Sequence, residues 1–355
     1  MKPSYLFMSP CGLNKYNSFI AIKKQIIPMK KTYISLFLLS LFILCSSCND
    51  EWTDELYENF VSFKAPLINE GITNIYVRYK GEGKTTFQQP LIVSGSTTNS
   101  KDLSVSIAVD PDTLQTLNFE RFQNREDFYY RQLSATYFTI PSQIGIKSGE
   151  NTALMPIDFT FKDIDMTEKW VLPLTILDDP SGNYNSHPRK HYRKALLRVN
   201  PFNNYSGTYS GTALKTNMKG YEDETPIVKS EIRSYVVDEN TIFFYAGNID
   251  EDRQDRRNYK VYATFNQTGG VRFWSDNPEM DFKLNKDASY TIAEQMDAVR
   301  PYLLHRYITI NNIDYEFTDY TMISTVDINY VVTGSVTLHR QLNTQIPDED
   351  QAILW

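Results

Sequence analysis

The segment LSVSIAV (Leu103–Val109) alternates between apolar residues and small residues. This period of two predicts a half-buried β-strand, because successive side chains of a strand point to opposite faces. Ile72–Lys80 shows the same alternation. Other strands are predicted at Phe60–Phe63, Pro90–Ser94, Ala135–Ile140, Thr152–Phe159, Trp170–Leu177 and Tyr192–Val199. Short strands separated by turn residues predict an Ig-like antiparallel β-sandwich over residues 59–199.

One helix is predicted within this sandwich. Asp110 has the side chain of an N-cap, Pro111 suits the first helical position, and Leu114 and Leu117 follow at helical spacing. We expect a short crossover helix here.

The second half of the chain has longer predicted strands. NPFNN (Asn200–Asn204) interrupts the pattern and predicts a domain boundary, with a second domain over residues 200–355. About eight strands joined by short turns predict a meander that closes into a β-barrel, since closure removes exposed edges. Ser289–Arg300, which stops at Pro301, is predicted as a helix. The predicted strands are Val228–Val237, Ile242–Ala246, Tyr259–Phe265, Val271–Trp274, Met280–Leu284, Tyr307–Ile310, Tyr320–Asp327 and Tyr330–His339.

Both halves resemble parts of known surface lipoproteins. The segments DPDTLQTLNF (110–119), YYRQLSATYFTIP (129–141), IKSGENTALMPIDF (146–159) and WVLPLTILDDPSG (170–182) resemble a sandwich domain of unknown function. That domain occurs in lipoproteins of polysaccharide-utilisation (Sus-like) loci and before some family 18 endoglycosidases. The opening at Tyr205–Gly211 and the strand Tyr330–Arg340 make the second half similar to the lipocalin-like C-terminal domain that often follows it. The resemblance implies a part in polysaccharide capture.

The N-terminal region is typical of an exported lipoprotein. Met29 begins a signal peptide over residues 29–47, with Lys30 and Lys31 before an apolar run that is too short to span a membrane. Ser46 and Ser47 precede Cys48, an ending that resembles a lipobox and predicts lipidation of Cys48. An ordinary cleaved signal is the alternative. We interpret residues 1–28 as an over-extended start and residues 48–58 as an acidic tether, which predicts a lipid-anchored protein on the outer face of the outer membrane.

Composition narrows the possible functions. All three cysteines lie at or before position 48, so the mature chain has no disulfide or thiolate metal site. From Cys48 onward it carries 30 Lys and Arg against 43 Asp and Glu, a net charge of −13. This charge argues against a nucleic-acid partner and makes strongly anionic glycans a less favoured ligand.

Three segments resemble functional motifs, but the residues around them do not support the usual function of those motifs. Gly81–Thr85 ends like a phosphate-binding loop, but no helix follows, so we interpret it as a hairpin turn. His187 and His191 have the spacing of helical metal ligands but lie beside Pro188 in a predicted loop. The acidic cluster at Asp250–Asp255 lacks the turn glycine of a calcium loop and contains Arg253. We therefore predict no metal site and no cofactor. Paired carboxylates for glycoside hydrolysis remain possible among the many acids.

Sugar binding needs flat aromatic faces flanked by hydrogen-bonding side chains. Two predicted clusters meet this requirement: Trp274 with Arg272, Asp276 and Asn277, and Tyr184 with Asn185, His187 and Tyr192. The alternative is a structural role, in which these aromatic residues only cover a barrel rim or pack within a loop.

The sequence therefore favours a non-enzymatic surface protein that binds a glycan or polysaccharide, with an outer-membrane transporter complex as a possible partner. A structural or adhesive surface protein without sugar affinity is one alternative, and a glycoside hydrolase is another.

Overall fold

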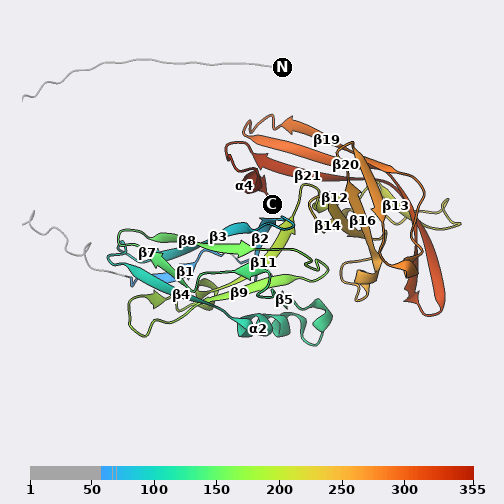
Figure 1. Cartoon of the computed structure of the whole chain (residues 1–355). Helices are drawn as coiled ribbons and strands as arrows, with labels where there is room; N and C mark the ends of the chain where they lie inside the picture. Colours follow the sequence, from blue (N-terminus) through green and yellow to red (C-terminus); the bar gives the residue numbers. More distant parts are fainter. Residues whose placement is uncertain (1–56, 66, 69) are drawn as a thin grey trace, which may run out of the picture. The chain divides into compact units, whose positions relative to one another are not determined.

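The computed structural model describes residues 57–65, 67–68 and 70–355, and it is almost entirely β-structure (Figure 1). Cys48, the predicted signal peptide and nearly all of the predicted tether lie outside the described residues. The all-β fold class predicted from the sequence is confirmed.

Two sheets form the first half of the fold. One has the strand order β10–β1–β3–β8–β6, and the other has β2–β11–β9–β4–β7 with β5 beside β9. The bounds in the first sheet are β1 Phe60–Phe63, β3 Thr85–Ser94, β6 Phe138–Thr139, β8 Thr152–Phe159 and β10 Asn185–Ser186. Those in the second are β2 Thr73–Arg78, β4 Leu103–Val109, β5 Arg131–Gln132, β7 Gln143–Ile146, β9 Trp170–Ile176 and β11 Lys194–Phe202.

The apolar faces of these strands form the sandwich core. Val105 and Ile107 of β4 are buried while Ser104 is exposed, as the alternation predicts. The first sheet contributes Leu91, Ile157 and Phe159 to the same cluster. Burial of such side chains contributes roughly 1.5–3 kcal/mol each, and the described residues contain no cysteine that could add a disulfide.

Helix α2 (Pro111–Phe122) forms where the sequence predicts it. The Asp110 carboxylate accepts a hydrogen bond from the Thr113 backbone N–H at 3.4 Å, so Asp110 acts as the N-cap. Leu114 packs in a small cluster with Val171 of β9 and Leu196 of β11. The helix therefore covers the outer side of the second sheet (Figure 1).

The sandwich differs from its prediction in three respects. Three strand pairs are parallel, namely β1 with β10, β2 with β11 and β5 with β9. The turn at Gly81–Thr85 is not a hairpin, because β2 and β3 belong to different sheets. Strand β11 also continues through Asn200 and Pro201, since its pairing with β2 extends to Phe202.

The second half is a closed barrel of eight antiparallel strands. Each of β12, β14, β15, β16, β17, β19, β20 and β21 pairs with the next, and β21 pairs back with β12. Their bounds are β12 Gly207–Ser210, β14 Glu231–Val236, β15 Thr241–Tyr245, β16 Lys260–Phe265, β17 Gly270–Trp274, β19 Ala288–Met296, β20 Leu303–Ile323 and β21 Val326–Asn343. The shorter strands β13 (Leu214–Met218), β18 (Lys283–Leu284) and β22 (Ile353–Leu354) pair at the margins. The predicted meander is confirmed.

One helix prediction in this half is wrong. Residues 289–296, predicted as helix, form strand β19, which pairs residue by residue with β20 from Ser289↔Asn311 to Met296↔Leu304. Ala293, Glu294, Gln295 and Met296 favour helix in isolation, but pairing with a long neighbouring strand overrides that preference. The predicted strands Tyr307–Ile310 and Tyr320–Asp327 are likewise parts of one long hairpin, β20–β21.

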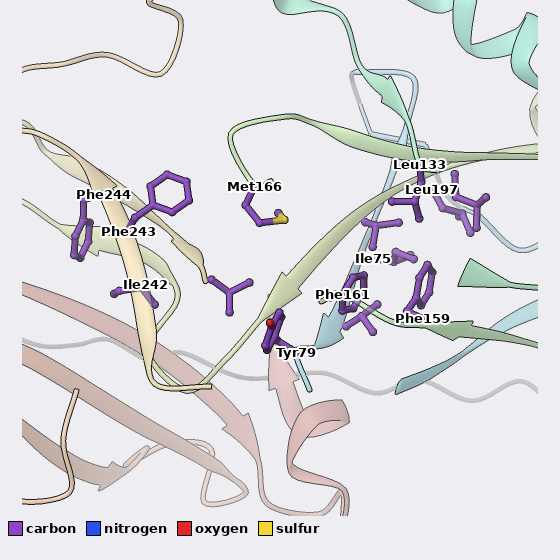
Figure 2. Packing of buried hydrophobic residues seen from close by; sticks show 14 of the residues in the cluster. Ile75, Tyr79, Leu133, Phe159, Phe161, Met166, Leu197, Ile242, Phe243 and Phe244 are labelled. Carbon is purple, nitrogen blue, oxygen red and sulfur yellow. The ribbon is translucent and has the colours of Figure 1, made fainter. Parts of the chain in front are cut away.

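Side chains fill the barrel interior. Ile242 and Phe244 of β15 are buried in a cluster shown in part in Figure 2. The interior cavity has a volume of about 20 Å³ and is lined mainly by apolar residues such as Val261, Phe273 and Val336. A water needs roughly 10–15 Å³ on this measure, so the cavity has no room for a sugar. Any ligand of that size must bind outside the barrel.

Candidate functional site

Trp274 ends a row of aromatic rings on the outside of the barrel. Tyr235, Phe243, Tyr262 and Trp274 lie directly opposite one another on β14, β15, β16 and β17. The Trp274 ring stacks on Tyr262 at a centroid distance of 4.2 Å, and its indole N–H donates to the Thr264 hydroxyl at 3.2 Å. Trp274 is half-buried.

The predicted partners of Trp274 are largely engaged within the protein. Asp276 accepts a hydrogen bond from the Tyr262 hydroxyl at 2.8 Å, and burial together with this contact raises the pKa of Tyr262. The Asn277 amide donates to the Asn258 carbonyl and the Tyr320 hydroxyl. Arg272 is exposed. The cluster is a structured rim with limited free hydrogen-bonding capacity.

The second predicted cluster is only partly assembled. Tyr184 is buried, and its hydroxyl donates to the Leu177 carbonyl and accepts from the Ser106 N–H, so its ring presents no open face. His187 and Tyr192 lie together with ring centroids 4.6 Å apart, and burial lowers the pKa of His187. Asn185 is exposed in β10.

A different cleft, of about 230 Å³, combines aromatic and polar groups. Trp355 stacks on Tyr76 with centroids 4.0 Å apart and planes 2° apart, and it meets the Phe202 ring edge-on at 4.7 Å. About half of the Trp355 surface remains exposed. An aromatic ring held in place but open to solvent is the type of surface on which the C–H face of a sugar packs.

Polar side chains lie beside these rings. Arg233 donates to the Asn200 side-chain oxygen at 3.4 Å and lies over the Tyr235 ring at 5.4 Å. Thr208 and His339 also line the cleft. Guanidinium, amide and hydroxyl groups can donate to and accept from sugar hydroxyls.

A second hollow, of about 340 Å³, adjoins the cleft and shares Thr208 and Arg233 with it. Its lining is more acidic and includes Glu231, Asp250 and Glu251, with Asp250 paired to Lys229 at 2.8 Å. The two hollows therefore meet at Thr208 and Arg233 but have different linings.

His339 is also part of a hydrogen-bonded chain that the sequence did not indicate. Its Nε2 lies 2.8 Å from Nδ1 of His305, whose Nε2 lies 3.0 Å from the Asp297 carboxylate. The bond from His305 holds the pKa of Asp297 well below its usual range, and burial lowers the pKa of His339. Tyr307 stacks on His339 at 4.5 Å, so the His339 ring is held in a fixed orientation.

The acidic cluster at Asp250–Asp255 contributes Asp250 and Glu251 to the adjoining hollow. Arg253 bonds to Asp255 and Asp319, so the acidic loop is held by an arginine. In residues 57–355, apart from 66 and 69, no group of three or more His, Cys, Asp or Glu side chains is arranged to hold a metal ion. Among the described helices, none has the length and apolarity needed to cross a bilayer.

Comparisons with known proteins place this fold in a family. Residues 52–180 match a domain of unknown function, DUF4973, and residues 193–337 match a family described as a C-terminal domain. A Bacteroides ovatus protein of unknown function is 46% identical, with a TM-score of 0.77 over 83% of this chain and 100% of that one. The chain belongs to the family of this Bacteroides protein. A search of curated proteins finds no match.

Two further Bacteroides proteins are similar to the chain over most of its length. An auxiliary nutrient binding protein from Bacteroides thetaiotaomicron is 46% identical, with a TM-score of 0.75 over 84% of this chain and 100% of that one. Another protein of unknown function from Bacteroides ovatus is 38% identical, with a TM-score of 0.73 over 85% of this chain and 97% of that one. The family therefore shares the whole described architecture, not one domain of it.

Proposed function

We propose that this protein binds glycans on the cell surface and assists their uptake, and that the cleft beside Trp355 is the binding site. The observation that carries the proposal is the cleft itself. A half-exposed Trp355, held by Tyr76 and Phe202, lies beside Arg233 and Asn200. This pairing of a flat apolar face with hydrogen-bonding groups is what sugar recognition requires.

Two further observations support binding at this surface. The barrel interior is filled, so the ligand cavity of a lipocalin-like carrier is absent from the described part of the chain. The lining of the cleft contains no Asp or Glu, whereas glycoside hydrolysis uses a pair of carboxylates. Both favour non-covalent capture at this place.

The cellular context is also part of the proposal. The lipobox-like ending at Cys48 and the acidic residues after it support a lipid-anchored protein on the outer face of the outer membrane. The Bacteroides thetaiotaomicron relative, described as an auxiliary nutrient binding protein, supports a role in nutrient capture. A Sus-like transporter complex would then receive the bound glycan.

A glycan array and affinity gels with the intact protein test the proposal. If the cleft is the site, Trp355→Ala should weaken retention by about tenfold or more, because a stacking face worth ~1.5 kcal/mol is lost. Trp274→Ala should leave retention unchanged, and Tyr221→Ala, which removes an exposed ring from a turn, is the matched control.

The outcomes separate the alternatives. Loss of retention in Trp274→Ala alone would move the site to the barrel rim. Failure to retain any glycan would contradict the proposal. Release of reducing sugar would indicate a glycoside hydrolase, and co-purification with envelope proteins without sugar affinity would indicate a structural or adhesive role.

A further inference from the structure

Arg340 is a buried cation in the wall of the cleft. Its side chain on β21 is 6% exposed, and the guanidinium lies near the rings of Trp355 and Phe202, at 5.6 and 5.9 Å from their centroids. Nη2 donates to the backbone carbonyls of Asn203 at 2.8 Å and Ser206 at 2.5 Å. Burial lowers the pKa of Arg340 to about 10, so the group still carries its charge at neutral pH.

No carboxylate in the described part of the chain forms an ion pair with Arg340. Its Nε–H is buried without a hydrogen-bond partner among these residues. Asp350, whose charge acts on Arg340, is bonded to Arg78 instead. A buried charge without a counter-charge lowers the stability of the folded protein. Such an unpaired charge is a candidate for pairing with a charged ligand.

A second arginine lines the cleft. Arg233 supplies a second guanidinium, and the cleft lining contains no Asp or Glu, although Glu231, Asp250 and Glu251 line the adjoining hollow. This is a local exception, because the chain from Cys48 onward carries a net charge of −13. A cleft with two arginines and no acid attracts an anionic group, and guanidinium groups match the planar oxygens of carboxylates and sulfates.

We infer that the cleft recognises an anionic sugar, with its carboxylate or sulfate beside Arg340 and Arg233 and its ring against Trp355. This inference rests on the proposed function and specifies the class of glycan. It reverses the expectation from net charge alone, because the charges that line the cleft act on the ligand at closer range than the rest of the surface.

Isothermal titration calorimetry on the intact protein can test the inference with matched ligands. An oligogalacturonate and its methyl ester share one backbone and differ in charge, and a sulfated galactan oligomer with its desulfated form tests the other anion. We expect an acidic form to bind at least about tenfold more tightly than its neutral counterpart, as a charge-assisted hydrogen bond provides. The ligand pair that shows tighter binding of its acidic form identifies whether the cleft recognises a carboxylate or a sulfate.

Variants can test whether the two arginines cause the preference for the charged ligand. Arg233→Gln and Arg340→Gln should each reduce the preference for the charged form, and Arg340→Lys should restore part of it. Arg125→Gln, at an exposed arginine paired with Asp127, is the control and should leave the preference unchanged. Thermal unfolding establishes whether each variant is folded. If Arg340→Gln does not fold, the loss of preference in Arg233→Gln still tests the inference.

Equal affinity for charged and neutral forms would overturn the inference while leaving glycan binding intact. The inference would also fail if Arg233→Gln and Arg340→Lys both kept the full preference. Absence of binding to any glycan would instead contradict the proposed function.

Discussion

The carboxylate of Asp319 is a buried charge that the protein fully satisfies. It is 0% exposed and accepts hydrogen bonds from two guanidinium nitrogens of Arg253, at 2.5 and 2.8 Å, and from the Tyr259 hydroxyl at 2.9 Å. Burial alone would raise the pKa of Asp319, but the bonds from Arg253 and Tyr259 lower it to about 2. Arg340, by contrast, has no carboxylate partner among the described residues, and its Nε–H is unpaired there.

Asp319→Asn should lower the free energy of unfolding by about 3–5 kcal/mol, because it leaves the Arg253 guanidinium facing a neutral group. Urea denaturation at pH 7 measures the change, and Asp223→Asn, at an exposed position, is the control. The acid response follows from the lowered pKa: the stabilisation by Asp319 is complete above about pH 4 and is lost as the pH falls through 2. The variant should therefore lose less stability than the parent across this range, and an identical loss would contradict the assignment.

At the scale of the element, the hairpin β20–β21 depends on one glycine. Gly334 has a φ of +131°, and a Cβ there would lie 2.0 Å from the Ala213 carbonyl oxygen. The pairing register shifts between Ile310 and Ile313, opposite this position, and Asn312 has a φ of +59°. The bulge and the glycine together let β21 pair with β13, β12 and β20 along its length.

Gly334→Ala should destabilise the barrel by at least about 3 kcal/mol, since the clash is with backbone and adds to the cost of the positive φ. Gly149→Ala is the matched control, because Gly149 also has a positive φ but its Cβ would meet nothing within 4 Å. Its cost should be about 1–2 kcal/mol. Equal midpoints in thermal unfolding would show that strain at φ alone, not the contact with Ala213, matters at Gly334.

The elements differ in how far the sequence could predict them. Leu103–Val109 and Thr152–Phe159 have the predicted bounds because their alternation coincides with one buried face. Ser289–Arg300 was predicted wrongly because local helix preference says nothing of a partner strand that lies later in the chain. Gly334 lies within the predicted strand Tyr330–His339, but the sequence does not show that Ala213 lies against it.

At the scale of the whole molecule, the cleft is a product of the tertiary fold. Tyr76, Arg233 and the C-terminal pair Arg340 and Trp355 come from three regions far apart in the chain. No spacing rule connects them, so the sequence pointed to Trp274 and Tyr184 as candidate sugar-binding residues and did not indicate this cleft. Tyr184 in particular combines with Leu177 and Ser106 as a buried structural group.

The predicted anchor can be tested on the whole protein in cells. Cys48→Ser should abolish labelling by a fatty-acid analogue and move the protein from the membrane fraction to the soluble fraction, because a stable anchor requires the acyl chains. Cys45→Ser, three residues earlier, is the control and should remain in the membrane fraction. Membrane retention of unacylated Cys48→Ser would exclude the lipid anchor.

The packed interior of the barrel has a consequence for the rates at which a ligand binds and dissociates. A molecule that docks in a surface groove never becomes enclosed, so neither arrival nor departure waits for a gate to open. Encounter rates should then lie near the ordinary ~10⁵–10⁷ M⁻¹ s⁻¹ for docking without rearrangement, and the lifetime of the complex should depend on its direct contacts. Under the proposed function, a bound glycan would pass to a neighbouring transporter without a gating step.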